Sequence, residues 1–135
     1  MTGKGAVADV VRYWWTKAKE SMQAARRDVA AGAYALAINR AYFSLFYAVS
    51  ALLLEGGHRF KKHAGVRAAF NRHLVKTGRV NRKHADLYNQ LFDNRQAGDY
   101  VEFTEFDGPY VQEKIAACEE FLSDVRTLLK SLPPE

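Results

Sequence analysis

The stretch FDNRQAGDY, residues 92–100, places an arginine within the apolar pattern of an expected helix. Arg95 follows Leu91 by four residues and Leu87 by eight, so a helix would set it on the apolar face, where a guanidinium needs a partner. Asp99 is four residues further on and could form a local ion pair, which contributes about 0.3 kcal/mol when exposed. Alternatively, Arg95 lies at the mouth of a groove and stabilises phosphate charge, for which its planar fork of donors is suited.

Two polar residues interrupt the most apolar stretch of the chain, AYALAINRAYFSLFYAVSALLLE. These residues, Asn39 and Arg40, could face the same groove as Arg95 and bind a nucleic acid or a nucleotide there. A buried, unpaired guanidinium is costly. Arg40 is therefore expected either to reach that groove or to pair with an acid such as Asp93 or Asp99.

Lys61, Lys62 and His63 stand at the start of another expected helix. The unpaired N–H groups of a helix N-terminus attract phosphate. His63 could therefore bind a phosphate together with the two lysines, or it could be a capping or surface residue.

The spacing of the histidines argues against a metal site. Successive histidines are separated by five, ten and eleven residues, and no carboxylate lies among them. Two histidines that bind one metal ion from the same helix are typically four residues apart, and no pair here has that spacing. The phosphate-loop patterns GxGxxG and GxxxxGK[ST] are also absent. The sequence therefore predicts neither a metal nor a cofactor. The four histidines are His58, His63, His73 and His84.

Charge is distributed unevenly along the chain. The net charge is +5, but residues 56–85 hold nine Lys or Arg and no acid. Residues 86–124 hold ten acids against Arg95 and Lys114. This asymmetry indicates either an electropositive surface that could bind a polyanion or an acidic partner, or simply a solvated loop and helix face.

Hydrophobic periodicity predicts an all-α protein, because apolar residues recur at three- and four-residue steps. The expected helices cover residues 6–31, 33–55, 63–76, 82–97 and 108–131. Glycines at or after their ends are typical helix stops: Gly32, Gly56, Gly57, Gly78 and Gly98. The short links predict an antiparallel up-and-down bundle of four long helices plus a shorter one. The 135 residues are expected to form a single domain, with its core at about residues 8–131.

Several features favour a cytoplasmic protein. An internal disulfide is excluded because Cys118 is the only cysteine of the sequence. The place of Cys118 in an apolar stripe predicts that it is a core residue and not a nucleophile. The N-terminus lacks the apolar segment of a signal peptide. The longest nearly apolar run, residues 41–54, is shorter than the roughly 20 residues that span a bilayer. We therefore expect a buried central helix and no membrane segment.

Three segments, taken in order, resemble the HEPN domain family, in particular its small stand-alone prokaryotic members. They are NRAYFSLFYAVSALLLEGG (39–57), KKHAGVRAAFNRHLVKTG (61–78) and LFDNRQAGDY (91–100), and the likeness covers about residues 10–130. The resemblance implies a bundle of antiparallel helices that forms a homodimer. It also implies a partner, a small nucleotidyltransferase of the MNT type, in a toxin–antitoxin pair.

The resemblance also implies a chemistry. Active members of the family cut RNA without metal through an Arg-x4-6-His motif, in which the arginine stabilises the phosphate and the histidine moves the proton of the attacking 2'-hydroxyl. Arg95 matches the motif arginine, whereas Tyr100 stands where the histidine is expected, and no histidine follows it. A tyrosine with its ordinary pKa near 10 is ionised in only about one molecule in a thousand at pH 7, so Tyr100 is a proton donor but a poor base.

These observations favour an RNA- or nucleotide-binding component of a HEPN/MNT toxin–antitoxin-type module. One alternative is an active metal-independent endoribonuclease with Arg95, Asp99 and Tyr100 as its catalytic residues. If His63 approached Tyr100 in space, it could supply the missing base. Another alternative is a non-catalytic subunit that binds the nucleotidyltransferase and is adenylylated on Tyr100. The apolar central helix and the pair Trp14 and Trp15 also predict a dimer, because they offer much apolar surface.

Overall fold

The computed structural model describes residues 4–60, 62–100 and 106–133, without the side chains of residues 4 and 95–100. Five α-helices and one π-helical segment follow one another, and no strand occurs among these described residues. They are α1 (Lys4–Ala30), α2 (Tyr34–Glu55), α3 (His63–Phe70), η1 (Asn71–Val75), α4 (Arg82–Tyr100) and α5 (Gly108–Leu128). The predicted all-α bundle of four long helices and a shorter one is confirmed.

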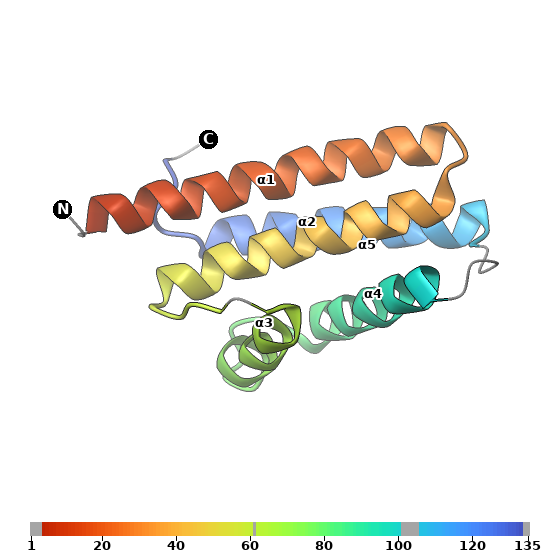
Figure 1. Cartoon of the computed structure of the whole chain (residues 1–135). Coiled ribbons are helices and arrows are strands. Elements are labelled where there is room, and N and C mark those ends of the chain that lie inside the picture. The colour runs from red at the N-terminus through yellow and green to blue at the C-terminus, as the bar shows by residue number, and fades with distance from the viewer. Residues whose placement is uncertain (1–3, 61, 101–105, 134–135) are drawn as a thin grey trace.

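The long helices α1, α2, α4 and α5 alternate in direction along the chain, as an up-and-down bundle requires (Figure 1). The short helix α3 is seen nearly end-on in the same view, so its axis crosses those of the others (Figure 1). Helix α2 contacts α1, α3, α4 and α5. It is therefore the centre of the bundle and the element against which a site can be assembled.

Two glycines end the first two helices as predicted. Gly32 has φ +74°, and the N–H groups of Gly32 and Ala33 bond to the carbonyls of Val29 and Asp28. Gly57 has φ +90°, and two backbone hydrogen bonds of the same pattern close the end of α2. A residue with a side chain rarely adopts this left-handed conformation, so the glycines permit both sharp exits.

Small residues in the contact between α2 and α1 let the two helices approach closely. Ala41 and Ala48 of α2 and Ala18 of α1 are fully buried. Ser44 donates a buried hydrogen bond of 2.7 Å to the carbonyl of Ala18 and so needs no water. Helix α2 also has the length and hydropathy of a membrane span, but 61% of that window is buried inside the bundle, as in the core helix of a soluble protein.

The apolar stripe of α5 is buried along its whole length, as the periodicity predicts. Its members are Val111, Ile115, Cys118, Leu122, Val125 and the following Leu129. Burial and the neighbouring Glu119 raise the pKa of the Cys118 thiol to about 12. The thiol therefore stays protonated at neutral pH, and the prediction of a core residue is confirmed.

Two helix predictions need correction. Helix α4 does not stop at Gly98 but continues to Tyr100, so the arginine motif lies within helical backbone. The expected helix over residues 63–76 is α-helical only to Phe70 and then π-helical, with the Lys76 N–H bonded to the Asn71 carbonyl at 2.9 Å. The π-helical segment forms the last turn of this helix, and a turn follows it.

Glu55 fastens the segment after α5 to the end of α2. Its carboxylate oxygens accept hydrogen bonds from the backbone N–H of Lys130 at 2.9 Å and of Ser131 at 2.7 Å. Desolvation alone would raise the pKa of Glu55, but these hydrogen bonds and the Arg79 charge outweigh it, so the pKa is lowered from 4.5. The charged form is therefore the one that the fold stabilises.

We expect Glu55→Gln to lower the free energy of unfolding by about 1 kcal/mol at pH 7, because charge-assisted hydrogen bonds are replaced by neutral ones in a partly exposed site. The pKa of Glu55 in the folded state lies below 4.5. The difference in free energy of unfolding between the two proteins is therefore complete above about pH 4.5, and it disappears as the pH falls through the folded-state pKa. Urea unfolding of both proteins across pH 3 to 7 measures it. The exposed Glu113→Gln is the control, and a difference independent of pH would contradict the prediction.

Candidate functional site

A hydrogen-bonded pair joins the start of α3 to the middle of α2. The hydroxyl of Tyr42 and Nδ1 of His63 are 2.8 Å apart. The imidazole also stacks on the ring of Phe46, with centroids 4.1 Å apart and planes 11° from parallel. Tyr42 is fully buried and His63 half-buried, so one face of the bundle holds the imidazole in a defined orientation. The Tyr42 hydroxyl can donate to an unprotonated Nδ1 or accept a hydrogen bond from a protonated one.

The same tyrosine contacts α4. Its ring centroid lies 5.8 Å from that of Phe92 and 6.0 Å from that of Tyr88. Burial and the neighbouring Tyr42 raise the pKa of Tyr88 far above its ordinary value of 10.0, so this hydroxyl remains protonated. The guanidinium of Arg67 lies 4.5 Å from the centre of the Phe92 ring and 3.2 Å from the Asp93 carboxylate. The His63–Tyr42 pair is therefore fixed against one particular face of α4.

That face of α4 leads to the arginine motif. Tyr88 and Phe92 are four residues apart and both touch Tyr42. Position 95 follows Phe92 by three residues and Tyr88 by seven, so the helical register puts it on the same face. The predicted catalytic side chains at Arg95, Asp99 and Tyr100 lie outside the described side chains, as does all of Lys61. Their roles stay predictions.

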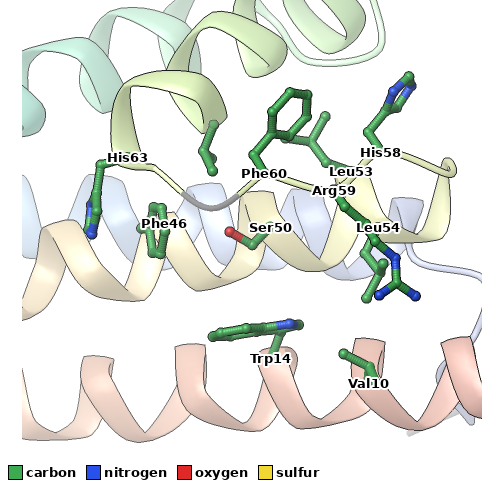
Figure 2. Close-up of a pocket in the computed structure, with 11 residues that line it drawn as sticks. Val10, Trp14, Phe46, Ser50, Leu53, Leu54, His58, Arg59, Phe60 and His63 are labelled. Carbon is green, nitrogen blue, oxygen red and sulfur yellow. The ribbon is translucent and has the colours of Figure 1, made fainter.

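A groove of about 650 Å³ opens on the other side of His63, between α1, α2 and the segment that leads into α3. Figure 2 shows Trp14 of α1 across one side, Phe46 beside His63, and Phe60 and Arg59 from the connecting segment. The full lining is Val10, Trp14, Phe46, Ser50, Leu53, Leu54, His58, Arg59, Phe60, His63 and Val66. His63 thus lines this groove and is linked to the α4 face through its hydrogen bond to Tyr42.

Comparison with known proteins identifies the fold family. A sequence model of the HEPN domain matches residues 11–130. The chain belongs to the HEPN domain family. It is 42% identical to a UPF0332 protein of Thermotoga maritima over 91% of this chain and 93% of that protein. It is 32% identical to a Methanocaldococcus jannaschii protein named "putative toxin", over 73% of this chain and 69% of that protein. A second such protein of that organism is 29% identical, over 85% of each chain.

The two polar residues of α2 point to different neighbours in this HEPN domain. Asn39 precedes Tyr42 by three residues and Phe46 by seven, so it shares their face of α2 and extends the site. Arg40 lies 2.7 Å from the carboxylate of Asp28 in α1. The acid that pairs with Arg40 is thus neither of the two that the sequence suggested. A binding role for Arg40 stays a prediction, since the ion pair leaves its side chain 44% exposed.

The basic segment of the HEPN domain keeps most of its charge available. Among the described residues, two of its cations form ion pairs within 4.0 Å: Arg67 with Asp93, and Lys83 with Glu120. The described cations without such a pair are Arg59, Lys62, Arg72, Lys76, Arg79 and Arg82. These unpaired cations lie mainly in the connection before α3, in η1 and in the turn after it, and their use as a surface for a polyanion stays a prediction.

Two histidines stack on that surface. The rings of His58 and His73 are 4.1 Å apart and 17° from parallel. Partial desolvation and the positive charges of the adjacent His58 and Arg72 lower the pKa of His73, which favours its neutral form. Within the described parts of the chain, no three His, Cys, Asp or Glu residues gather where they could hold a metal ion.

Sequence reasoning missed the residues that organise the site. Tyr42, Trp14 and Phe60 carry no motif, and an aromatic residue at helical spacing ordinarily indicates core packing. A usable signal was the stripe of α2 that begins at Asn39 and passes through Tyr42 and Phe46. His63 was singled out as a phosphate ligand, but its hydrogen bond to Tyr42 depends on a contact between residues 21 positions apart.

Proposed function

We propose that this HEPN protein binds RNA as a component of a toxin–antitoxin-type module, with Arg95 as a phosphate-binding residue. The observation that carries the proposal is the His63–Tyr42 pair, which lies against the α4 face that leads to position 95. An imidazole and a guanidinium from two helices would then meet one phosphate. The unpaired cations of the connection before α3 and of η1 support the same ligand class, and two relatives named "putative toxin" support the setting.

The proposal includes two protein partners. A second copy of the chain would bring two arginine motifs into one cleft, and a nucleotidyltransferase of the MNT type would act as the antitoxin. The structure buries Trp15 and most of α2 within the chain itself, so the dimer rests on the family and not on excess apolar surface. Residues 8–131 would fold as one domain in the reducing cytoplasm.

RNA affinity should fall about tenfold in Arg95→Ala, because one phosphate contact contributes about 1.4 kcal/mol when it is charge-assisted. The slope of log affinity against log salt should also decrease by about 1. Fluorescence anisotropy with a labelled single-stranded RNA at several salt concentrations measures both quantities. Arg26→Ala is the matched control, since Arg26 forms a surface ion pair with Glu119 at 2.8 Å. Equal affinity and slope in both variants would contradict the role of Arg95.

A second function, metal-independent endoribonuclease activity, is favoured by one specific observation. Tyr100 stands in the place of the motif histidine, but His63 of α3 is hydrogen-bonded to Tyr42, which contacts the face of α4 that leads to the motif, and its imidazole would take the part of the missing histidine. His63 would accept the proton of the attacking 2'-hydroxyl, Arg95 would stabilise the charge on the phosphate, and Tyr100 would donate a proton to the leaving oxygen.

A further inference from the structure

We propose that the groove between α1, α2 and the segment entering α3 is a subsite for an unpaired RNA nucleobase. The inference deepens the proposed function, on which it rests. The groove and the proposed phosphate site share His63, so a strand that places its phosphate at His63 would bring a neighbouring base to the groove. The volume of about 650 Å³ lies within the range of pockets that enclose small planar ligands.

Two aromatic walls of the groove are held in place by other rings. Trp14 is half-buried and stacks on Tyr47, with centroids 5.4 Å apart and planes 24° from parallel. Phe46 is half-buried and stacks on His63. Figure 2 shows the Trp14 indole lying across the groove from Ser50. Aromatic surfaces that are already ordered lose little conformational entropy when a base stacks on them.

The third aromatic wall is Phe60, which is 44% exposed despite its apolar side chain. Its ring lies against the backbone of α3 at Gly65, where an added Cβ would meet Phe60 Cδ1 at 3.4 Å. His58 stacks beside it, with ring centroids 6.5 Å apart. Phe60 is therefore an exposed aromatic side chain with a defined position, as a base-stacking surface requires. Exposure of a large apolar side chain lowers solubility, so a binding role would explain why it is exposed.

The charge of the groove selects an anionic ligand. Arg59 and His58 line it, Lys62 adjoins it in sequence, and none of its lining residues is an acid. Ser50 adds a hydroxyl on the α2 side, where it could bond to the edge of a base. Stacking surfaces combined with nearby cations are typical of sites for single-stranded nucleic acid. A base-paired nucleotide would keep both faces covered by its neighbours, so the groove favours an unpaired one.

The test compares two labelled probes by fluorescence anisotropy: a short oligoadenylate and an abasic ribose-phosphate oligomer of the same length. The unsubstituted protein should bind the oligoadenylate about tenfold more tightly, because stacking contributes that much per base. Phe60→Ala should remove most of this preference and leave abasic binding unchanged. Leu36→Ala is the matched control, since Leu36 is also 44% exposed but lies at the other end of α2.

A second variant and an optical signal guard against a folding artefact. Arg59→Ala should weaken oligoadenylate binding more than Arg79→Ala, an exposed cation outside the groove. The oligoadenylate, but not the abasic oligomer, should quench tryptophan emission through Trp14, since Trp15 is buried. Circular dichroism of each variant should match that of the unsubstituted protein.

The possible outcomes separate this inference from the proposed function. RNA binding that is equal for both probes, or unaffected by Phe60→Ala, would overturn the base subsite and leave RNA binding intact. Failure of the protein to bind either probe would overturn both. If Phe60→Ala changed self-association in sedimentation without changing oligoadenylate affinity, the groove would be a protein contact and the base subsite would be wrong.

Discussion

His63→Ala is expected to slow RNA cleavage by about 100-fold or more, because a positioned proton-transfer group contributes a factor of about 10² to 10⁴. In the proposed reaction the 2'-oxygen would attack the adjacent phosphorus, its proton would pass to the imidazole, and the bond to the 5'-oxygen would break as Tyr100 donates a proton to that oxygen. The products would carry a 2',3'-cyclic phosphate and a 5'-hydroxyl. Gel electrophoresis of an end-labelled RNA in the presence of EDTA measures the rate, and the cyclic end identifies the chemistry.

Two further variants separate catalysis from simple charge. Tyr42→Phe removes the hydroxyl that lies 2.8 Å from His63 Nδ1, so it should lower the cleavage rate less than His63→Ala and shift its pH profile. His73→Ala removes another imidazole, one outside the lining of the groove, and should have little effect. Cleavage that is lost equally in His73→Ala and His63→Ala, or that is absent in the unsubstituted protein, would exclude His63 as the base.

Phe121→Ala is expected to lower the free energy of unfolding by about 3–5 kcal/mol, the usual cost of a large cavity in a core. The Phe121 ring is fully buried in α5. Its centroid lies 6.1 Å from that of Phe70 in α3 and 5.0 Å from that of His84 in α4. Because this one ring joins three helices, its loss should weaken the support of α3 and hence of His63. Urea unfolding followed by circular dichroism measures the effect.

The control for this prediction is Leu36→Ala, which truncates an exposed side chain and should change stability by less than about 0.5 kcal/mol. A loss below about 1.5 kcal/mol in Phe121→Ala would mean that the neighbouring rings collapse into the space. In that case RNA binding should also be unchanged, because α3 would keep its place.

Local patterns predicted the fold well because the relevant signals lie within one helix. The repeat of apolar residues in α5 and the glycines at positions 32 and 57 act over three to six residues, and both appear in the structure as expected. The extension of α4 past Gly98 and the π-helical turn were not predicted. A glycine ends a helix only if the chain leaves in the left-handed conformation, and nothing local in sequence decides whether it does.

The site was predictable only in part, because it is built from contacts between distant segments. The motif at Arg95 and the basic segment were visible as sequence patterns. The hydrogen bond of Tyr42 to His63 and the pairing of Arg40 with Asp28 depend on how the helices pack. Asn94 is a similar case, since its amide donates to the Tyr110 hydroxyl of α5 at 2.6 Å. Such partners follow from the three-dimensional arrangement and not from spacing along the chain.

The π-helical turn of η1 determines where this domain can change length during evolution. Its wide turn accommodates one residue more than an α-helical turn would, as the Lys76 to Asn71 hydrogen bond shows. Losing one residue within η1 would restore a regular α-helical turn and leave α3 before it unchanged. Losing one within α3 would rotate every later side chain by about 100° and separate His63 from Val66 and Phe70 on their common face. We therefore expect a one-residue deletion to disturb the fold less in η1 than in the turn that begins at His63.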